Sequence, residues 1–168
     1  MKIVFGITGW KNSGKTTLVA KLVEEFTRRG KQVSTVKHAH ASFDIDKPGT
    51  DSHAHRSHGA HEVAIVSQKR WAIMHEIENG REEPSLEEIL AKLSPCDLVL
   101  VEGYKTSALP KIECIRSDFV VNEAIWKSNS TISALATDGP LIDCALPVLS
   151  LNDVAAIADF IERHGVKA

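Results

Sequence analysis

The stretch of this sequence with the clearest chemical content lies near its N-terminus. It runs Gly9-Trp10-Lys11-Asn12-Ser13-Gly14-Lys15-Thr16, which matches the pattern G-x-x-x-x-G-K-[ST], and Thr17 follows it. The two glycines allow backbone conformations that a Cβ atom would forbid, so successive N–H groups can turn toward phosphate oxygens. The lysine supplies a charge for the terminal phosphates, and the Thr16 hydroxyl is a ligand for Mg²⁺. We therefore predict that this phosphate loop, residues 9–16, binds a nucleotide together with Thr17.

Acidic residues at two later points are candidates to complete a metal and hydrolysis site. Glu102 ends an apolar run, where proteins with a phosphate loop keep an acid that orients Mg²⁺ or its bound water. Asp46, with Asp51 as second choice, lies in a long polar loop of the kind that reaches the terminal phosphate. We expect Thr16, Asp46 and Glu102 to hold Mg²⁺, and Lys15 to join the two acids in catalysis. The alternative for the acids is an ordinary role in turns and helix caps.

A further carboxylate is a candidate to recognise a base. Asp138 follows a predicted strand later in the chain than Glu102. In guanine-specific proteins with a phosphate loop, an aspartate at this point accepts hydrogen bonds from the guanine N1–H and exocyclic amine. The sequence has no N-K-x-D pattern, so a simple turn at Asp138-Gly139 is the alternative. Residues 150–153 are candidates for the opposite wall of the pocket, and Trp10 would lean over the nucleotide or pack on a neighbouring loop.

Histidines are concentrated in one segment, which raises the question of a metal site. Six of the eight fall between residues 38 and 61: His38, His40, His53, His55, His58 and His61. His58 and His61 could share one face of a helix and bind a transition metal, although Gly59 weakens that helix. The alternative is a polar surface that titrates just below neutral pH. No cysteine partner and no H-E-x-x-H pattern accompanies them, which favours the polar surface.

The phosphate loop needs a strand before it and a helix after it. An apolar, β-branched run covers residues 2–8, and the residues after the loop repeat at helical spacing: Leu18, Val19, Leu22, Val23 and Phe26. Further strands are predicted at 32–37, 62–67, 70–75, 97–103, 111–116, 131–136 and 147–151. Further helices are predicted from a cap at 51 or 52 to about 59, after a capping box at 85–88, and after a cap at 152 or 153.

The order of these elements predicts the fold class. Residues 62–67 and 70–75 are expected to form an antiparallel hairpin, because only two residues join them. The stretch 118–130 gives no clear signal. Strands that alternate with helices after a phosphate loop predict the three-layer α/β fold of P-loop NTPases, with a mostly parallel, mixed sheet flanked by helices. We expect one nucleotide-binding domain over residues 1–168.

Composition and charge limit the classes of partner that the chain is expected to bind. The 168 residues are 43% hydrophobic and 25% charged, with a net charge of -2 and no basic stripe, which argues against a nucleic-acid binder. No apolar run approaches membrane-spanning length, and no signal peptide precedes the predicted first strand. The three cysteines, Cys96, Cys114 and Cys144, lie far apart and are expected to be free thiols. We expect a cytoplasmic protein that binds neither nucleic acid nor membrane.

Three stretches together resemble one bacterial family. They are the phosphate loop with its strand, the segment from Val36-Lys37-His38 through Asp46-Lys47-Pro48-Gly49-Thr50-Asp51-Ser52 to Gly59-Ala60, and residues 97–105. The middle segment is the most specific, and the resemblance extends over nearly the whole chain. In these features the sequence is similar to the molybdopterin-guanine dinucleotide biosynthesis adapter proteins, the B component of that pathway.

The resemblance implies a GTP-binding protein with weak GTPase activity that uses Mg²⁺ and forms homodimers. Its implied partner is the nucleotidyltransferase that joins GMP to molybdopterin, and molybdopterin itself is a candidate ligand. The resemblance carries phosphate or acidic roles to Gly14, Lys15, Thr16, Thr17, Asp46 and Glu102. It supplies no base-reading tetrad, so guanine selection stays open. Two alternatives are an ATP-dependent small-molecule kinase or ligase, and a nucleotide-dependent metal chaperone that would use the histidines.

Overall fold

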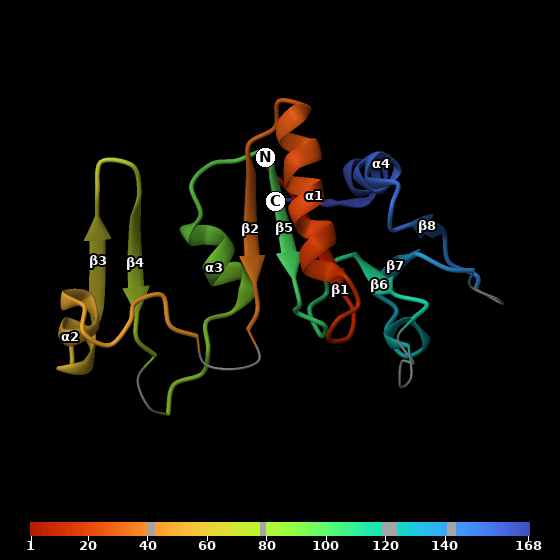
Figure 1. Ribbon diagram of the computed structural model, residues 1–168. Helices are drawn as coiled ribbons and strands as arrows, with labels where there is room; N and C mark the ends of the chain where they lie inside the picture. The colour runs from red at the N-terminus through yellow and green to blue at the C-terminus, as the bar shows by residue number, and fades with distance from the viewer. Residues whose placement is uncertain (40–42, 78–79, 119–123, 141–143) are drawn as a thin grey trace. The chain divides into compact units, whose positions relative to one another are not determined.

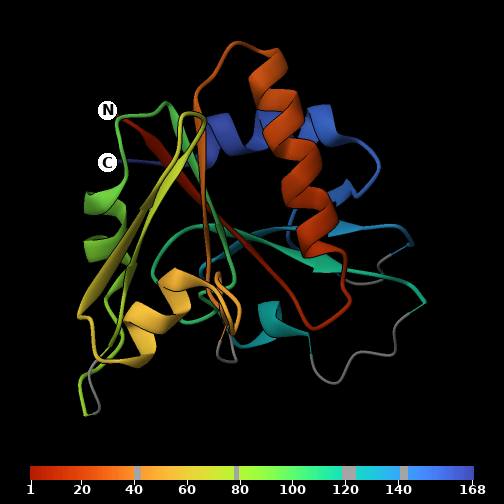
Figure 2. The same cartoon turned by 60° about the vertical axis from the view of Figure 1, so that its left-hand side comes forward.

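The computed structural model describes residues 1–168 except 40–42, 78–79, 119–123 and 141–143. Contacts divide the chain into two compact units (Figures 1 and 2). Unit 1 contains residues 1–38 and 89–168, and unit 2 contains residues 39–88. The expectation of one nucleotide-binding domain over the whole length stays a prediction.

Unit 1 is built on a central sheet whose strands follow the order β2-β5-β1-β6-β7-β8. These strands are β1 Ile3–Thr8, β2 Val33–Lys37, β5 Leu98–Glu102, β6 Lys111–Ile115, β7 Ile132–Thr137 and β8 Val148–Ser150. All of these neighbours pair in parallel. The short strand β9, Val166–Lys167, pairs antiparallel with Ile3 and Val4 at the start of β1. The pairing of β1 with β6 begins later, at Gly6. The mostly parallel, mixed sheet predicted from the sequence is therefore confirmed, although β9 itself was not predicted.

Two amphipathic helices cover one face of this sheet. They are α1, Lys15–Arg28, and α4, Val154–His164, and they lie side by side (Figure 1). Alternate residues of a strand point to opposite faces, so Phe5 and Ile7 of β1 meet the apolar stripes of both helices in one buried core. Asp153 caps α4 by accepting a hydrogen bond from the Ala156 N–H at 3.0 Å, as one of the two predicted caps.

The opposite face of the sheet carries a second, smaller core over β7. The short 3₁₀ helix η1, Ile125–Lys127, packs its Ile125 against Ile132 and Leu135. A register shift between β6 and β7 lets these two β7 residues face the same side. Helix η1 lies in the stretch 118–130 that gave no sequence signal, and residues 119–123 of that stretch lie outside the described residues.

Unit 2 consists of one helix and the predicted hairpin. Helix α2 spans Asp51–Ser57, and strands β3, Glu62–Val66, and β4, Trp71–His75, pair antiparallel. The predicted cap at residue 51 or 52 is wrong. Thr50 is the cap, because its backbone is extended and its Oγ1 accepts from the His53 N–H at 3.4 Å, whereas the next two residues are already helical. The capping box before α3, Leu86–Lys92, is confirmed by reciprocal bonds between Ser85 and Glu88.

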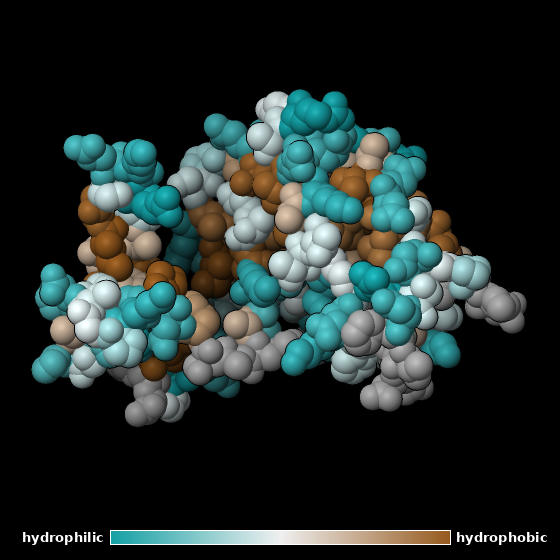
Figure 3. Space-filling model, viewed as in Figure 1, coloured by the Kyte–Doolittle hydropathy of each residue, from teal (hydrophilic) through white to brown (hydrophobic). Residues whose placement is uncertain are grey.

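The hairpin of unit 2 presents apolar side chains to solvent. Val66 pairs with Trp71 and Ala64 with Ile73, so these four lie on one face. Val66, Trp71 and Ile73 are 76%, 68% and 54% exposed, and brown, apolar surface is visible over β3 and β4 (Figure 3). An exposed apolar face of this kind is typical of a surface that meets another protein.

Candidate functional site

The phosphate loop lies at the carboxyl end of β1, between β1 and α1. The strand order reverses at β1. After β1 the chain places β2 and β5 on one side of it, and it then places β6, β7 and β8 on the other. Ligands of open α/β sheets bind outside the carboxyl ends of the strands at such a switch point. The strand, loop and helix predicted around residues 9–16 are therefore in place.

The backbone of the phosphate loop has the conformation that a phosphate cradle needs. Gly9, Asn12 and Gly14 have positive φ angles of 143°, 65° and 90°. A Cβ atom on Gly9 would collide with the Ser13 hydroxyl and would lie 2.6 Å from the Cys114 carbonyl oxygen, so only glycine fits there. The Ser13 hydroxyl is buried and has no hydrogen-bond partner among the described residues. This unpaired buried group fits a loop whose polar atoms await a ligand.

The side chain of Lys15 curls back over the loop. Its Nζ donates a hydrogen bond to the Trp10 carbonyl oxygen at 2.6 Å. Burial lowers the pKa of the Lys15 ammonium below its usual range, because the charged form loses part of its hydration. A phosphate that enters the cradle would replace that lost hydration with direct charge pairing.

Three side chains meet where the sequence predicts Mg²⁺. Thr16 Oγ1 donates to Glu102 Oε1 at 2.8 Å, and Lys37 Nζ lies 3.3 Å from the same carboxylate oxygen. The Glu102 side chain is only 10% exposed. A hydroxyl and a carboxylate are the hard oxygen ligands that Mg²⁺ prefers, so these residues fit the predicted metal.

The other predicted metal ligand, Asp46, belongs to unit 2. Its carboxylate is buried and accepts a hydrogen bond from Arg56 at 2.8 Å; the Arg56 guanidinium also lies 3.0 Å from Asp44 and 3.6 Å from Glu76. The Arg56 pairing holds the pKa of Asp46 below its usual range. Asp51, the second choice, is in the first turn of α2. The Mg²⁺ role of Asp46 stays a prediction.

No transition-metal site is found at the histidines in the part of the chain that the structure describes. No group of three or more His, Cys, Asp or Glu side chains there is placed to hold a metal. His58 Nδ1 lies 2.7 Å from the Ala54 carbonyl oxygen, and the rings of His61 and His75 are in contact. His40 lies outside the described residues.

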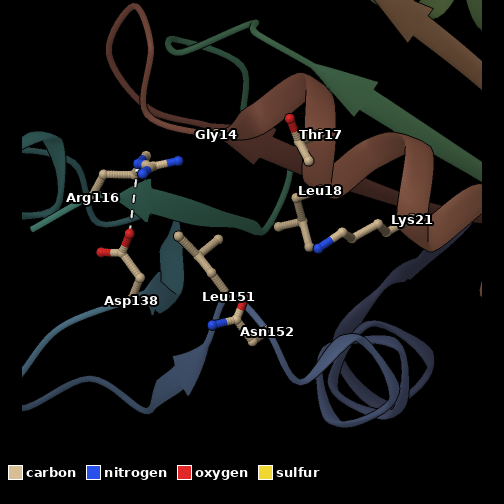
Figure 4. A pocket seen from close by; sticks show the side chains of 8 residues that line it. All are labelled: Gly14, Thr17, Leu18, Lys21, Arg116, Asp138, Leu151 and Asn152. Atoms are coloured by element: carbon tan, nitrogen blue, oxygen red, sulfur yellow. Dashed lines mark ion pairs between the residues drawn. The ribbon is translucent and has the colours of Figure 1, made fainter. Parts of the chain in front are cut away.

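A pocket beside the phosphate loop contains Asp138 (Figure 4). Its walls are Gly14, Thr17, Leu18, Lys21, Arg116, Asp138, Leu151 and Asn152. The structure therefore brings Asp138 and two residues of the predicted segment 150–153 together with the phosphate loop. The Ser117 N–H donates to Asp138 Oδ1 at 2.7 Å, which fixes the carboxylate and holds the pKa of Asp138 below its usual range.

Arg116 is a residue of this site that sequence reasoning missed, and Lys21, which lines the Asp138 pocket, is another. Arg116 lines both the Asp138 pocket and the pocket over residues 12–17. Its Nε lies 3.0 Å from Asp118 Oδ1 and 3.5 Å from Asp138 Oδ2. A sequence signal existed, because Arg116 directly follows β6 and carboxyl ends of parallel strands meet at one edge of the sheet.

Trp10 packs against a neighbouring loop, one of the two predicted alternatives. The Lys105 ammonium lies 4.0 Å from the centre of its ring. The indole is 40% exposed, so part of it remains accessible at the phosphate loop. A contact between Trp10 and a nucleotide stays a prediction.

Comparisons with known proteins assign the chain to a family. Residues 4–138 match the family described as Molybdopterin guanine dinucleotide synthesis protein B. The chain is 37% identical to the molybdopterin-guanine dinucleotide biosynthesis adapter protein of Escherichia coli over 161 residues, 94% of this chain and 90% of that protein. The Haemophilus influenzae adapter protein is 38% identical over 173 residues, 98% and 93% of the two chains.

Solved structures agree with this assignment. The MobB protein homolog from Bacillus stearothermophilus is 29% identical, with a TM-score of 0.69 over 95% of this chain and 98% of that one. Bacillus subtilis MobB, 19% identical with a TM-score of 0.74, shares the fold. In the described residues, no helix is long and apolar enough to cross a membrane. The chain belongs to the molybdopterin guanine dinucleotide synthesis protein B family.

Proposed function

We propose that this protein binds GTP with Mg²⁺ and acts as an adapter in the biosynthesis of molybdopterin guanine dinucleotide. The observation that supports the proposal is that two neighbouring pockets share three of their lining residues. Gly14, Thr17 and Arg116 line both the pocket over the phosphate loop and the pocket that contains Asp138. One nucleotide can therefore place its phosphates in the first pocket and its base in the second.

The residues of the site divide the work of holding a triphosphate. The loop N–H groups and the α1 N-terminus would bind phosphate oxygens, and the Lys15 ammonium would leave the Trp10 carbonyl for the terminal phosphates. Thr16 and Glu102 would hold Mg²⁺, which supplies positive charge to the transferring phosphoryl group. Asp46 stays a candidate third ligand.

Hydrolysis by such a site is expected to be slow. The residues that line the two pockets include no glutamine to orient a water, and Arg116 is paired with Asp118 and Asp138. Without these groups the site can bind the triphosphate well but stabilises the transition state weakly. We propose a GTPase turnover below about 1 s⁻¹.

Selection of guanine rests on Asp138. A fixed carboxylate can accept from both the N1–H and the amine of guanine, and adenine lacks this pair of donors. The Ser117 bond, which orients Asp138 at the pocket wall, supports this role. The alternative, an ATP-dependent small-molecule kinase or ligase, predicts the opposite base preference.

We further propose that the protein works as a cytoplasmic homodimer with the nucleotidyltransferase that joins GMP to molybdopterin, and that molybdopterin is a candidate ligand. The names of the E. coli and H. influenzae relatives support the pathway. The exposed apolar face of the β3–β4 hairpin, with Val66, Trp71 and Ile73, supports a protein partner.

Calorimetry with GTP and ATP, each with and without Mg²⁺, tests the nucleotide part of the proposal. We expect GTP to bind more tightly than ATP and Mg²⁺ to strengthen the binding. Capture of the purified nucleotidyltransferase by loaded and by empty protein tests the adapter part, and we expect tighter binding to the loaded form. ATP preference together with phosphate transfer to a small acceptor would support the kinase instead.

A further inference from the structure

Lys37 lies where the structure can hold a cation. It is the last residue of β2, and its partner in the parallel register is Glu102 of β5. Residues paired in this way point to the same face of a sheet, so the lysine and the carboxylate are neighbours. Lys37 Nζ lies 3.3 Å from Glu102 Oε1 and donates to Thr16 Oγ1 at 3.5 Å.

The two oxygen atoms that Lys37 contacts are those that would hold Mg²⁺. Thr16 Oγ1 and Glu102 Oε1 are 2.8 Å apart. Two ligands of an octahedral Mg²⁺, each at about 2.1 Å and at right angles, lie about 3.0 Å apart. The two oxygen atoms therefore have nearly the spacing of two ligands of one Mg²⁺, and the Lys37 ammonium contacts both of them.

We propose that Lys37 is an internal cation that holds the Mg²⁺ position in the nucleotide-free protein and yields it when Mg²⁺ arrives with the nucleotide. This inference rests on the proposed function. The ammonium would then move to a phosphate oxygen. Its side chain is 59% exposed, so it can leave Glu102 without losing a packed environment.

The consequence is an ordered loading of the site. A bare divalent ion must displace a like-charged ammonium from both ligands, which repels it at close range. A divalent ion that arrives bound to a triphosphate also brings phosphate oxygens, and the Lys37 ammonium can pair with one of these instead. Free Mg²⁺ should therefore bind weakly, and Mg²⁺ with nucleotide should bind well.

The test measures a divalent ion on the intact chain without nucleotide. Mn²⁺ serves as the probe, and its binding is followed by electron paramagnetic resonance. We expect Lys37→Gln to bind Mn²⁺ at least about tenfold more tightly than the parent, because one close positive charge is removed. Lys37→Arg keeps the charge and should bind as weakly as the parent. Glu102→Gln combined with Lys37→Gln should lose the gain.

Lys105→Gln is the matched control for the effect of removing any one positive charge near the site. It removes a lysine near the phosphate loop whose ammonium lies on the Trp10 ring. Equal Mn²⁺ affinity of Lys37→Gln and the parent would overturn the proposal, as would an equal gain in Lys105→Gln or undetectable binding in all variants. A parent that binds no nucleotide would overturn the proposed function instead, and the Mn²⁺ comparison would still be readable.

Discussion

Replacement of Lys15 by alanine separates a role in binding from a role in folding. In the structure, the half-buried ammonium donates a hydrogen bond to the Trp10 carbonyl oxygen at 2.6 Å. The desolvation of the ammonium offsets part of this charge-assisted bond, so its loss should cost only about 1 kcal/mol of folding stability. In a chain of this size, that corresponds to a fall in Tm of about 2–4 °C.

The cost to nucleotide binding should be much larger. Charge-assisted hydrogen bonds contribute about 1.5–3 kcal/mol each, and the ammonium can reach one or two phosphate oxygens. Loss of about 2–5 kcal/mol corresponds to GTP binding that is weaker by roughly 30-fold to several thousand-fold. Displacement of a fluorescent GTP analogue measures this range, and thermal unfolding measures the stability.

The control for Lys15→Ala is Lys31→Ala. Lys31 is exposed and follows the turn after α1, and its loss makes the same change in net charge. We expect it to bind GTP like the parent. If Lys15→Ala binds GTP within threefold of the parent and unfolds at the same temperature, the residues at 9–16 do not form a phosphate cradle and the reasoning fails.

Four further predictions address single groups. Glu102→Gln should reduce GTP hydrolysis at least about tenfold with a smaller effect on GTP affinity, which steady-state rates and calorimetry separate. Asp46→Asn should lower hydrolysis if Asp46 reaches Mg²⁺; a lower Tm with unchanged hydrolysis would assign it to its Arg56 pairing alone. Asp138→Asn should reduce the preference for GTP over ATP about tenfold or more while inorganic triphosphate binds unchanged. Burial raises the pKa of Cys114 to about 12, so at pH 8 only ~1 in 10,000 of its thiols is ionised; mass spectrometry after alkylation should find it protected until urea unfolds the chain.

The sequence was most informative where local chemistry decides the structure. The phosphate loop requires glycine at residue 9 for a steric reason, and its neighbours 2–8 and 18–26 show plain strand and helix periodicity. The capping box at 85–88 and the hairpin of 62–75 are similarly local. These features were predicted correctly because each depends on residues only a few positions apart.

Contacts between distant residues could not be predicted in the same way. The Arg56 pairing of Asp46 depends on the path of a long loop, and the pairing of β9 with β1 joins the two ends of unit 1. The end of a predicted strand placed Arg116 at the ligand-binding edge of the sheet, but only the strand order, with β6 beside β1, places it next to the phosphate loop. Such contacts arise from the topology of the sheet, which no local pattern specifies.

The buried charges of β6 explain how Arg116 is held at the site. Lys111 and Glu113 are both fully buried on the face of the sheet opposite α1. The Lys111 Nζ donates to the Ser107 carbonyl oxygen at 2.5 Å and to Thr131 Oγ1 at 2.8 Å.

Glu113 accepts from the Ile125 and Trp126 N–H groups at 2.9 and 2.8 Å. Burial raises the pKa of this carboxyl, and the two N–H groups oppose the rise. Burial of either group without these hydrogen-bond partners would lower the stability of the fold. Lys111 and Glu113 therefore attach the segments before and after β6 to this strand. Arg116 follows this anchored strand directly, so its backbone is held where its side chain can line both pockets and pair with Asp118 and Asp138.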